Sequence, residues 1–201
     1  SLSNDKRASV RAIVASAPIN DSKARGAIAL RLSRDRDWEV RRQACLTLGE
    51  YDTPKSIEAL LSRISDKHRY VRDAAETSLI ALKPNDKILD RLGSTYLKNP
   101  QSVNCAVTIL GALKVKRFSQ AVADVLAAAN AEEVKEADKD NELIYRCVIT
   151  LGKLAYSTSA DAVAPLASSK DEKVRQAVAF CLGRLKVPST YITIKTLSGD
   201  N

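Results

Sequence analysis

A short pattern of apolar residues returns five times along this chain with the same internal spacing. We count each copy from a register-zero residue, and these five residues are Val40, Val71, Ser102, Leu143 and Val174. In each copy a small or apolar residue follows at plus four, a leucine at plus eight and a large apolar residue at plus eleven. Successive copies are 31, 31, 41 and 31 residues apart. A fixed period of this length is typical of stacked repeat proteins, in which one unit cannot bury its apolar face alone.

The offsets predict an amphipathic helix in each copy, because positions 0, 4, 8 and 11 share one face of a helix. We expect this helix B at 38–51, 69–82, 101–113, 142–154 and 172–185. Cap-type residues and early prolines between the copies predict a second helix, helix A, at 21–33, 55–65, 86–97, 118–129 and 160–168. The chain is therefore predicted to be all-α, a right-handed α-α superhelix (an α-solenoid) of about five helical hairpins.

We predict a single repeat domain over residues 1–201. Its repeats are expected at about 21–51, 54–82, 85–113, 117–154 and 159–185. Residues 4–17 resemble a degenerate helix B, and residues 189–197 the opening of another helix A. Neither end has the polar surface of a terminal cap, and the chain has no methionine. We therefore expect a processed chain, or a part of a longer array.

Glycine occupies plus nine in four copies, as Gly49, Gly111, Gly152 and Gly183. A glycine within a helix costs about 1 kcal/mol relative to alanine. Four such positions predict that a neighbouring helix approaches too closely for a Cβ. Arginine follows the register-zero valine in three copies and is expected to reach the equivalent turn of the next repeat.

The pattern D-x-x-V-R…A…L-G-x-L, within about 31 residues, resembles the short HEAT-like repeats first grouped with phycobilisome lyases. The resemblance covers residues 21–185. It implies a stack of helical hairpins whose B helices line a concave surface. Ser102-Val103 and Leu143-Ile144 replace Val-Arg in the third and fourth copies, so we expect the row of arginines to be interrupted there.

The offsets plus two, plus six and plus ten lie opposite the core stripe of helix B, and we call this surface the B face. Several of its positions hold apolar or aromatic residues where a solvated helix would be polar. Such residues together with arginine are typical of an interface centre. The alternative is that curvature buries them against helix A or an adjacent repeat. The candidate partner-binding residues are Arg42, Leu46, Tyr145, Ile149, Lys153, Phe180 and Arg184.

The net charge is +8 and is uneven, since residues 1–42 hold ten Lys and Arg against five acids. This charge predicts either an acidic partner or a solvated basic face. The insertion at 131–141 is acidic and is expected to be an exposed loop or a helix extension.

Signs of catalysis are absent from the sequence. The single histidine, His68, has no nucleophile in a recognisable setting and is expected to be an ordinary surface residue. The four cysteines form no CxxC pair and are expected to be buried and reduced. No phosphate-cradling loop is present. We therefore expect no catalytic residue, no metal, no cofactor and no membrane span, and we expect a monomer in the cytoplasm.

Three functions remain open. The first is a non-catalytic scaffold that binds a partner protein or peptide on the concave helix-B surface. The second is nucleic-acid binding, similar to the HEAT-like DNA glycosylases. The third, implied by the resemblance alone, is a bilin lyase or chromophore chaperone.

Overall fold

The computed structural model describes residues 2–131 and 139–187. It divides the chain into two compact units, Ser1–Ile88 and Leu89–Asn201. We call them unit 1 and unit 2 and describe each by itself. The single domain over 1–201 stays a prediction.

The described residues form helices and connecting turns, with no strand among them. Helix B is present as α1 (Ala8–Ser16), α3 (Trp38–Leu48), α5 (Arg69–Leu82), α7 (Val103–Ala112), α9 (Asn141–Leu154) and α11 (Glu172–Leu185). Helix A is present as α2 (Ser22–Leu32), α4 (Pro54–Arg63), α6 (Asp86–Ser94), α8 (Ser119–Ala129) and α10 (Ala160–Val163). The short 3-10 helices are η1 (Leu2–Asn4), η2 (Tyr96–Lys98), η3 (Lys116–Phe118), η5 (Ser157–Ser159) and η6 (Ala164–Ser168). The all-α class is confirmed, and α1 confirms the degenerate helix B expected at 4–17.

Two of the A helices are shorter than expected. The helix predicted at 86–97 ends at Ser94, and η2 follows it. The helix predicted at 160–168 is α10 followed by η6. Pro165 lies in η6 and has no N–H to donate to the preceding turn, which favours a tighter, irregular continuation. The helix expected at 189–197, and most of the acidic insertion, lie outside the described residues.

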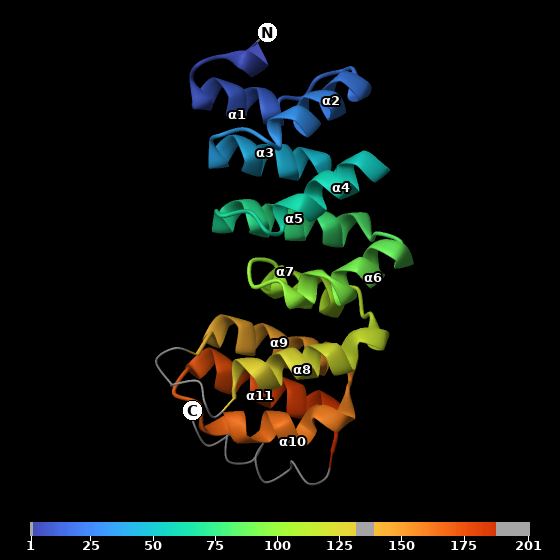
Figure 1. Ribbon diagram of the computed structural model, residues 1–201, viewed down its shortest axis with the longest axis vertical. Coiled ribbons are helices and arrows are strands. Elements are labelled where there is room, and N and C mark those ends of the chain that lie inside the picture. The colour runs from blue at the N-terminus through green and yellow to red at the C-terminus, as the bar shows by residue number, and fades with distance from the viewer. Residues whose placement is uncertain (1, 132–138, 188–201) are drawn as a thin grey trace. The chain divides into compact units, whose positions relative to one another are not determined.

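In unit 1, helix B packs on helix B of the next repeat. Helix α3 lies between α1 and α5, while α2 and α4 pack on their own B helices (Figure 1). The core is made of the register residues and their partners from helix A. Val40, Leu48, Leu60, Val71 and Leu79 are completely buried. Each such side chain stabilises the fold by roughly 1.5–3 kcal/mol relative to exposure.

Unit 2 repeats this arrangement. Helix α9 lies between α7 and α11, α8 packs on α9, and η6 packs on α11. Its core again consists of the register leucines, Leu110, Leu151 and Leu182, together with Leu126 from α8. Within each unit the packing of B helix on B helix confirms the α-solenoid class.

A repeated hydroxyl hydrogen bond fixes the register between adjacent B helices. The hydroxyl at plus seven donates to the carbonyl at plus five of the preceding helix B. Thr47 Oγ1 donates to the Ala15 carbonyl at 2.7 Å, and Ser78 Oγ donates to the Cys45 carbonyl at 3.0 Å. In unit 2, Thr150 Oγ1 donates to the Val107 carbonyl at 3.2 Å. The apolar register alone does not predict this link.

The plus-nine glycines lie beside these contacts. A Cβ added at Gly49 would lie 2.6 Å from Ser78 Oγ, and one added at Gly111 would lie 2.5 Å from Thr150 Oγ1. At Gly152 it would lie 2.9 Å from the Cα of Cys181. The expected close approach is therefore confirmed at three glycines. Gly183 is the exception, because no described atom lies within 4 Å of its added Cβ.

The arginines at plus one join each repeat to the next in unit 1. Arg11 donates to both carboxylate oxygens of Asp35, at 2.7 and 2.8 Å. Arg41 donates to both carboxylate oxygens of Asp66, at 2.8 Å each. The Arg41 pair confirms the expected reach into the next turn for the first of the three copies, and Arg11 shows the same reach from α1. Val103 and Ile144 occupy the equivalent positions in unit 2, so the row of paired arginines is interrupted there as expected.

The same arginines also hold the turn that precedes their own helix. Nη1 of Arg11, Arg41, Arg72 and Arg175 donates in each case to the two backbone carbonyls at minus five and minus four. One guanidinium therefore closes its own A-to-B turn and, in unit 1, can bind the carboxylate of the following turn.

Candidate functional site

The B face is positioned by the links between B helices, because the plus-seven and plus-nine residues fix how each helix is rotated. With those positions turned toward the neighbouring helices, the residues at plus two and plus six of each B helix share one face of that helix. The candidate residues fall into a set on α3 in unit 1 and a set on α9 and α11 in unit 2.

In unit 1 the two candidate residues are one helical turn apart on α3. Leu46 is 37% exposed, and Arg42 is half-buried. Leu46 therefore lies at the surface as the pattern predicted. Curvature does not bury it within the unit.

A further exposed apolar residue, not among the predicted candidates, lies on α1. Ile13 of α1 is 67% exposed and lines a hollow of about 220 Å³ between α1 and α3. The other lining residues are Ser9, Ala12, Ser16, Glu39 and Gln43. With Val10 as register zero, Ile13 lies at plus three, which is not a B-face offset but is next to plus ten on a helical wheel. The candidate set used only the five clear copies and left α1 out.

In unit 2 the structure brings Phe180 and Arg184 together against α9. The Arg184 guanidinium lies over the Phe180 ring, 5.7 Å from its centroid. Arg184 Nε also donates to the Gly152 carbonyl at 3.1 Å. A Cβ at Gly152 would lie 3.1 Å from Cε1 of Phe180, so the missing side chain makes room for this ring. Phe180 remains 40% exposed.

The other candidates of unit 2 lie on α9. Tyr145 and Ile149 are half-buried and Lys153 is exposed. Nearby, Arg146 donates to Glu142 at 2.7 Å and to Thr108 Oγ1 at 2.8 Å, which ties α9 to α7. Neither Tyr145 nor Ile149 belongs to the fully buried core.

An aromatic cluster in unit 1 was also missed. Trp38 and His68 stack with their ring centroids 4.1 Å apart and their planes at 10°, and Tyr70 leans on both at 5.6 Å. His68 was expected to be an ordinary surface residue. It is instead half-buried, and its Nδ1 has no hydrogen-bond partner among the described atoms. Trp38 lies at minus two of its copy, and His68 and Tyr70 lie at minus three and minus one of the next, so the register could have predicted their proximity.

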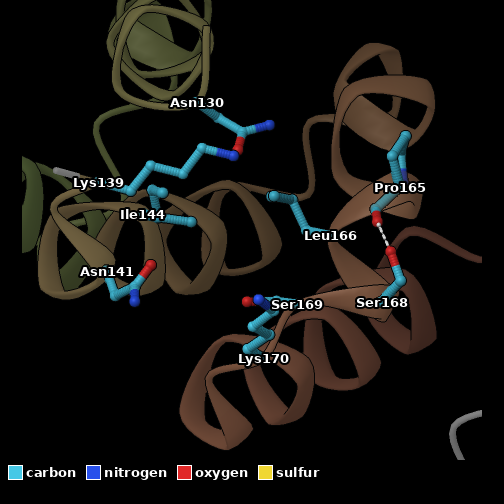
Figure 2. A pocket seen from close by; sticks show the side chains of 9 residues that line it. All are labelled: Asn130, Lys139, Asn141, Ile144, Pro165, Leu166, Ser168, Ser169 and Lys170. Carbon is cyan, nitrogen blue, oxygen red and sulfur yellow. Dashed lines mark hydrogen bonds between the residues drawn. The ribbon is translucent and has the colours of Figure 1, made fainter. Parts of the chain in front are cut away.

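A polar hollow of about 270 Å³ lies in unit 2 where α8, α9 and η6 meet (Figure 2). Ile144 and Leu166 form its apolar wall, and the remaining lining is mostly asparagine, serine and lysine. Ser168 Oγ donates to the Pro165 carbonyl at 2.9 Å. Among its described lining residues there is no carboxylate, histidine or cysteine, so these residues offer no acid–base pair or nucleophile.

The buried thiols are unsuited to nucleophilic chemistry. All four cysteines are free and buried. Burial raises the pKa of Cys45, Cys147 and Cys181 to about 12, so each stays protonated at neutral pH. The described residues also contain no group of three or more His, Cys, Asp or Glu side chains that could hold a metal ion.

With the repeats and the B face described, the chain can be compared with known proteins. Residues 2–80 match the family model of HEAT repeats. This part of the chain is therefore similar to HEAT repeats. The resemblance of the arginine–valine pattern to HEAT-like repeats is thereby confirmed. No curated protein matches the sequence.

Several solved structures resemble this chain at low sequence identity. The complex of CpcE and CpcF of phycocyanin lyase from Nostoc sp. PCC7120 is 15% identical, with a TM-score of 0.53, covering 96% of this chain and 77% of that one. An engineered protein is 16% identical over 92% of this chain and 94% of its own, with a TM-score of 0.49. A designed armadillo repeat protein is 15% identical over 90% and 96%, with a TM-score of 0.43. At this identity, the likeness to the CpcE–CpcF complex shows a shared fold alone.

None of the described helices combines the length and the apolar character that crossing a membrane requires.

Proposed function

We propose that this chain is a non-catalytic scaffold that binds a partner protein or peptide on the B face of its HEAT-like repeats. The observation that carries the proposal is the exposure of large apolar side chains at one repeated offset. Leu46 and Phe180 both occupy plus six, and both remain more than a third exposed. Ile149 holds the same offset on α9.

The composition of this surface supports a protein partner. Aromatic and arginine side chains are enriched at binding hot spots, and Phe180 and Arg184 lie in contact here. The exposed Ile13 extends the apolar surface along α1 and α3. The fold is also shared with the CpcE–CpcF complex, which is an assembly of two proteins.

The same comparison favours one alternative, a lyase or chromophore chaperone, because that complex is a phycocyanin lyase. Bilin binding would change the absorbance of the pigment on mixing with this chain. Nucleic-acid binding is the other alternative, and it would depend steeply on salt, since contacts with phosphates release counterions.

The test begins with affinity capture from the native lysate at low and at moderate salt, and continues with the purified partner. We expect Leu46→Ser combined with Phe180→Ser to weaken binding at least tenfold without loss of helicity. The control is Leu2→Ser, because Leu2 is 66% exposed and lies in η1, away from every B helix face. A loss in Leu2→Ser equal to that of Leu46→Ser or Phe180→Ser alone would refute the B face as the binding surface. Adding Tyr145→Ser should deepen the loss.

A further inference from the structure

The A helices of unit 1 form a groove that the B-face proposal does not use. It lies between α2 and α4 and has a volume of about 830 Å³, within the range of roughly 300–1,000 Å³ common for ligand sites. The lining residues are Ala27, Leu30, Arg31, Arg34, Pro54, Lys55, Glu58, Ala59 and Ser62.

Helical spacing explains the chemistry of this groove. On α2, Ala27, Leu30 and Arg31 recur at three- and four-residue intervals, and Arg34 follows in the turn after the helix. The lining positions of α4 recur at the same intervals, so each helix presents one stripe. Ala27 and Ala59 are small and leave the space open, while Leu30 and Pro54 add apolar surface. The result is an apolar floor between two helices.

Positive charge dominates the rim. The lining holds three cations, Arg31, Arg34 and Lys55, against the single carboxylate of Glu58. Arg31 donates to the side-chain oxygen of Asn4. Within residues 2–131 and 139–187, neither Arg34 nor Lys55 has a carboxylate within ion-pair distance.

The origin of this charge lies in the pairing elsewhere in the unit. Residues 1–88 hold 17 Lys and Arg against 12 Asp and Glu. The aspartates that follow α2 and α4, Asp35 and Asp66, are bound by Arg11 and Arg41, and Glu50 is bound by Arg25. These acids are therefore not available to neutralise the groove.

We propose that this groove binds an acidic peptide segment that inserts one apolar side chain. The apolar side chain would lie on Ala27, Leu30 and Ala59, and flanking carboxylates would pair with Arg34 and Lys55. Charge complementarity selects this occupant, because a basic peptide would meet three cations and a neutral one would leave them unpaired. The site lies on A helices, so it goes beyond the proposed function and can fail independently of it.

The test is a selection from a random peptide display library, using the whole chain as bait. We expect the enriched peptides to share one Leu, Ile or Phe with Asp or Glu on both sides. A synthetic peptide of that consensus should bind saturably, and replacing its acids with Lys should abolish binding. Enrichment without an acidic bias would overturn the proposal.

Variants then locate the site. Arg34→Glu combined with Lys55→Glu should weaken the consensus peptide at least tenfold, whereas Lys6→Glu combined with Lys67→Glu, an equal charge change at exposed lysines outside the groove, should weaken it less than threefold. Ala27→Gln fills the hollow without changing charge and should also weaken binding.

Two outcomes would contradict this assignment. Equal losses in the two charge-reversal pairs would show nonspecific attraction. Competition by a single-stranded oligonucleotide, lost in Arg34→Glu with Lys55→Glu, would assign the groove to nucleic acid instead. The B-face variants should leave peptide affinity unchanged, which separates a failure here from a failure of the proposed function.

Discussion

Arg41 and Asp66 form a bidentate ion pair that joins α3 to the turn preceding α5. Both N–H···O distances are 2.8 Å, and the two side chains are only 5% and 4% exposed. The same guanidinium holds the Asp35 and Arg36 carbonyls of its own turn. One side chain therefore connects two repeats.

Removing one partner of this pair should be costly, because the other charge stays buried without compensation. We expect Arg41→Ala or Asp66→Ala to lower the free energy of unfolding by about 3–5 kcal/mol. Urea unfolding followed by circular dichroism measures the change. Arg69→Ala, at the exposed pair with Asp73, is the control and should cost less than about 1 kcal/mol. A similar loss in both variants would contradict this role.

Acid should weaken unit 1 through the same carboxylates. The hydrogen bond from Arg11 lowers the pKa of Asp35. Burial alone would raise the pKa of Asp66, but hydrogen bonds from Arg41 and the His68 amide lower it below the ordinary value of 3.8. A lowered folded-state pKa gives stability above the unfolded pKa, and that stability is lost as the pH falls through the folded value.

We therefore expect the urea midpoint to fall between about pH 5 and pH 2. Asp35→Asn combined with Asp66→Asn should be less stable at pH 7 and less sensitive to this fall. An unchanged pH dependence in the double variant would show that other acids cause it.

The plus-nine glycines should respond to alanine in opposite directions. At Gly152 the new Cβ would meet the Cα of Cys181, a backbone atom that cannot rotate away, so we expect a loss of about 1–3 kcal/mol. At Gly183 no described atom is near, so Gly183→Ala should gain up to about 1 kcal/mol from helix propensity. Thermal unfolding of the two variants gives the comparison. Destabilisation at Gly183 would show that this position is covered.

The hydroxyl link can be tested by an isosteric change. Thr150→Val keeps the shape and removes the donor to the Val107 carbonyl, so we expect a loss of about 0.5–1.5 kcal/mol. Thr150→Ser retains the hydroxyl and should keep the hydrogen bond. If Thr150→Ser lowers the free energy of unfolding as much as Thr150→Val does, packing of the methyl group is the larger effect.

The thiols should be unreactive in the folded chain. Because Cys45, Cys147 and Cys181 have pKa values raised to about 12, iodoacetamide at pH 8 should modify them only after unfolding. Mass spectrometry of native and urea-treated protein measures the labelling. Rapid labelling of a native thiol would show that its helix opens.

Much of the fold could be predicted because the apolar register and the arginine at plus one are periodic in the sequence. The bounds of α5 and α11 agree with the expected helices at 69–82 and 172–185. The breaks after Ser94 and Val163 were missed, because periodicity reports burial and not local backbone geometry. Pro165 was the available signal for the second break.

The B face was predicted in part. Leu46 and Phe180 are exposed, as the helical wheel required. The contact of Arg184 with Phe180 and Gly152 depends on how α11 approaches α9, and no single-helix pattern contains that distance. The groove between α2 and α4 was missed for the same reason. Its lining comes from two helices, and the sequence of neither helix alone indicates a groove.

The two arginine–aspartate pairs of unit 1 occupy equivalent positions in successive repeats. Arg11 and Arg41 occupy the same position of their helices, and Asp35 and Asp66 both lie five residues before the next register-zero residue. If residues 36–66 were deleted as one 31-residue block, Asp35 would be followed directly by the turn that now leads into α5. Arg11 would then face the same carboxylate, Asp35, at the start of a different helix. The number of repeats in such a chain can therefore change by whole units while every joining arginine keeps an acceptor.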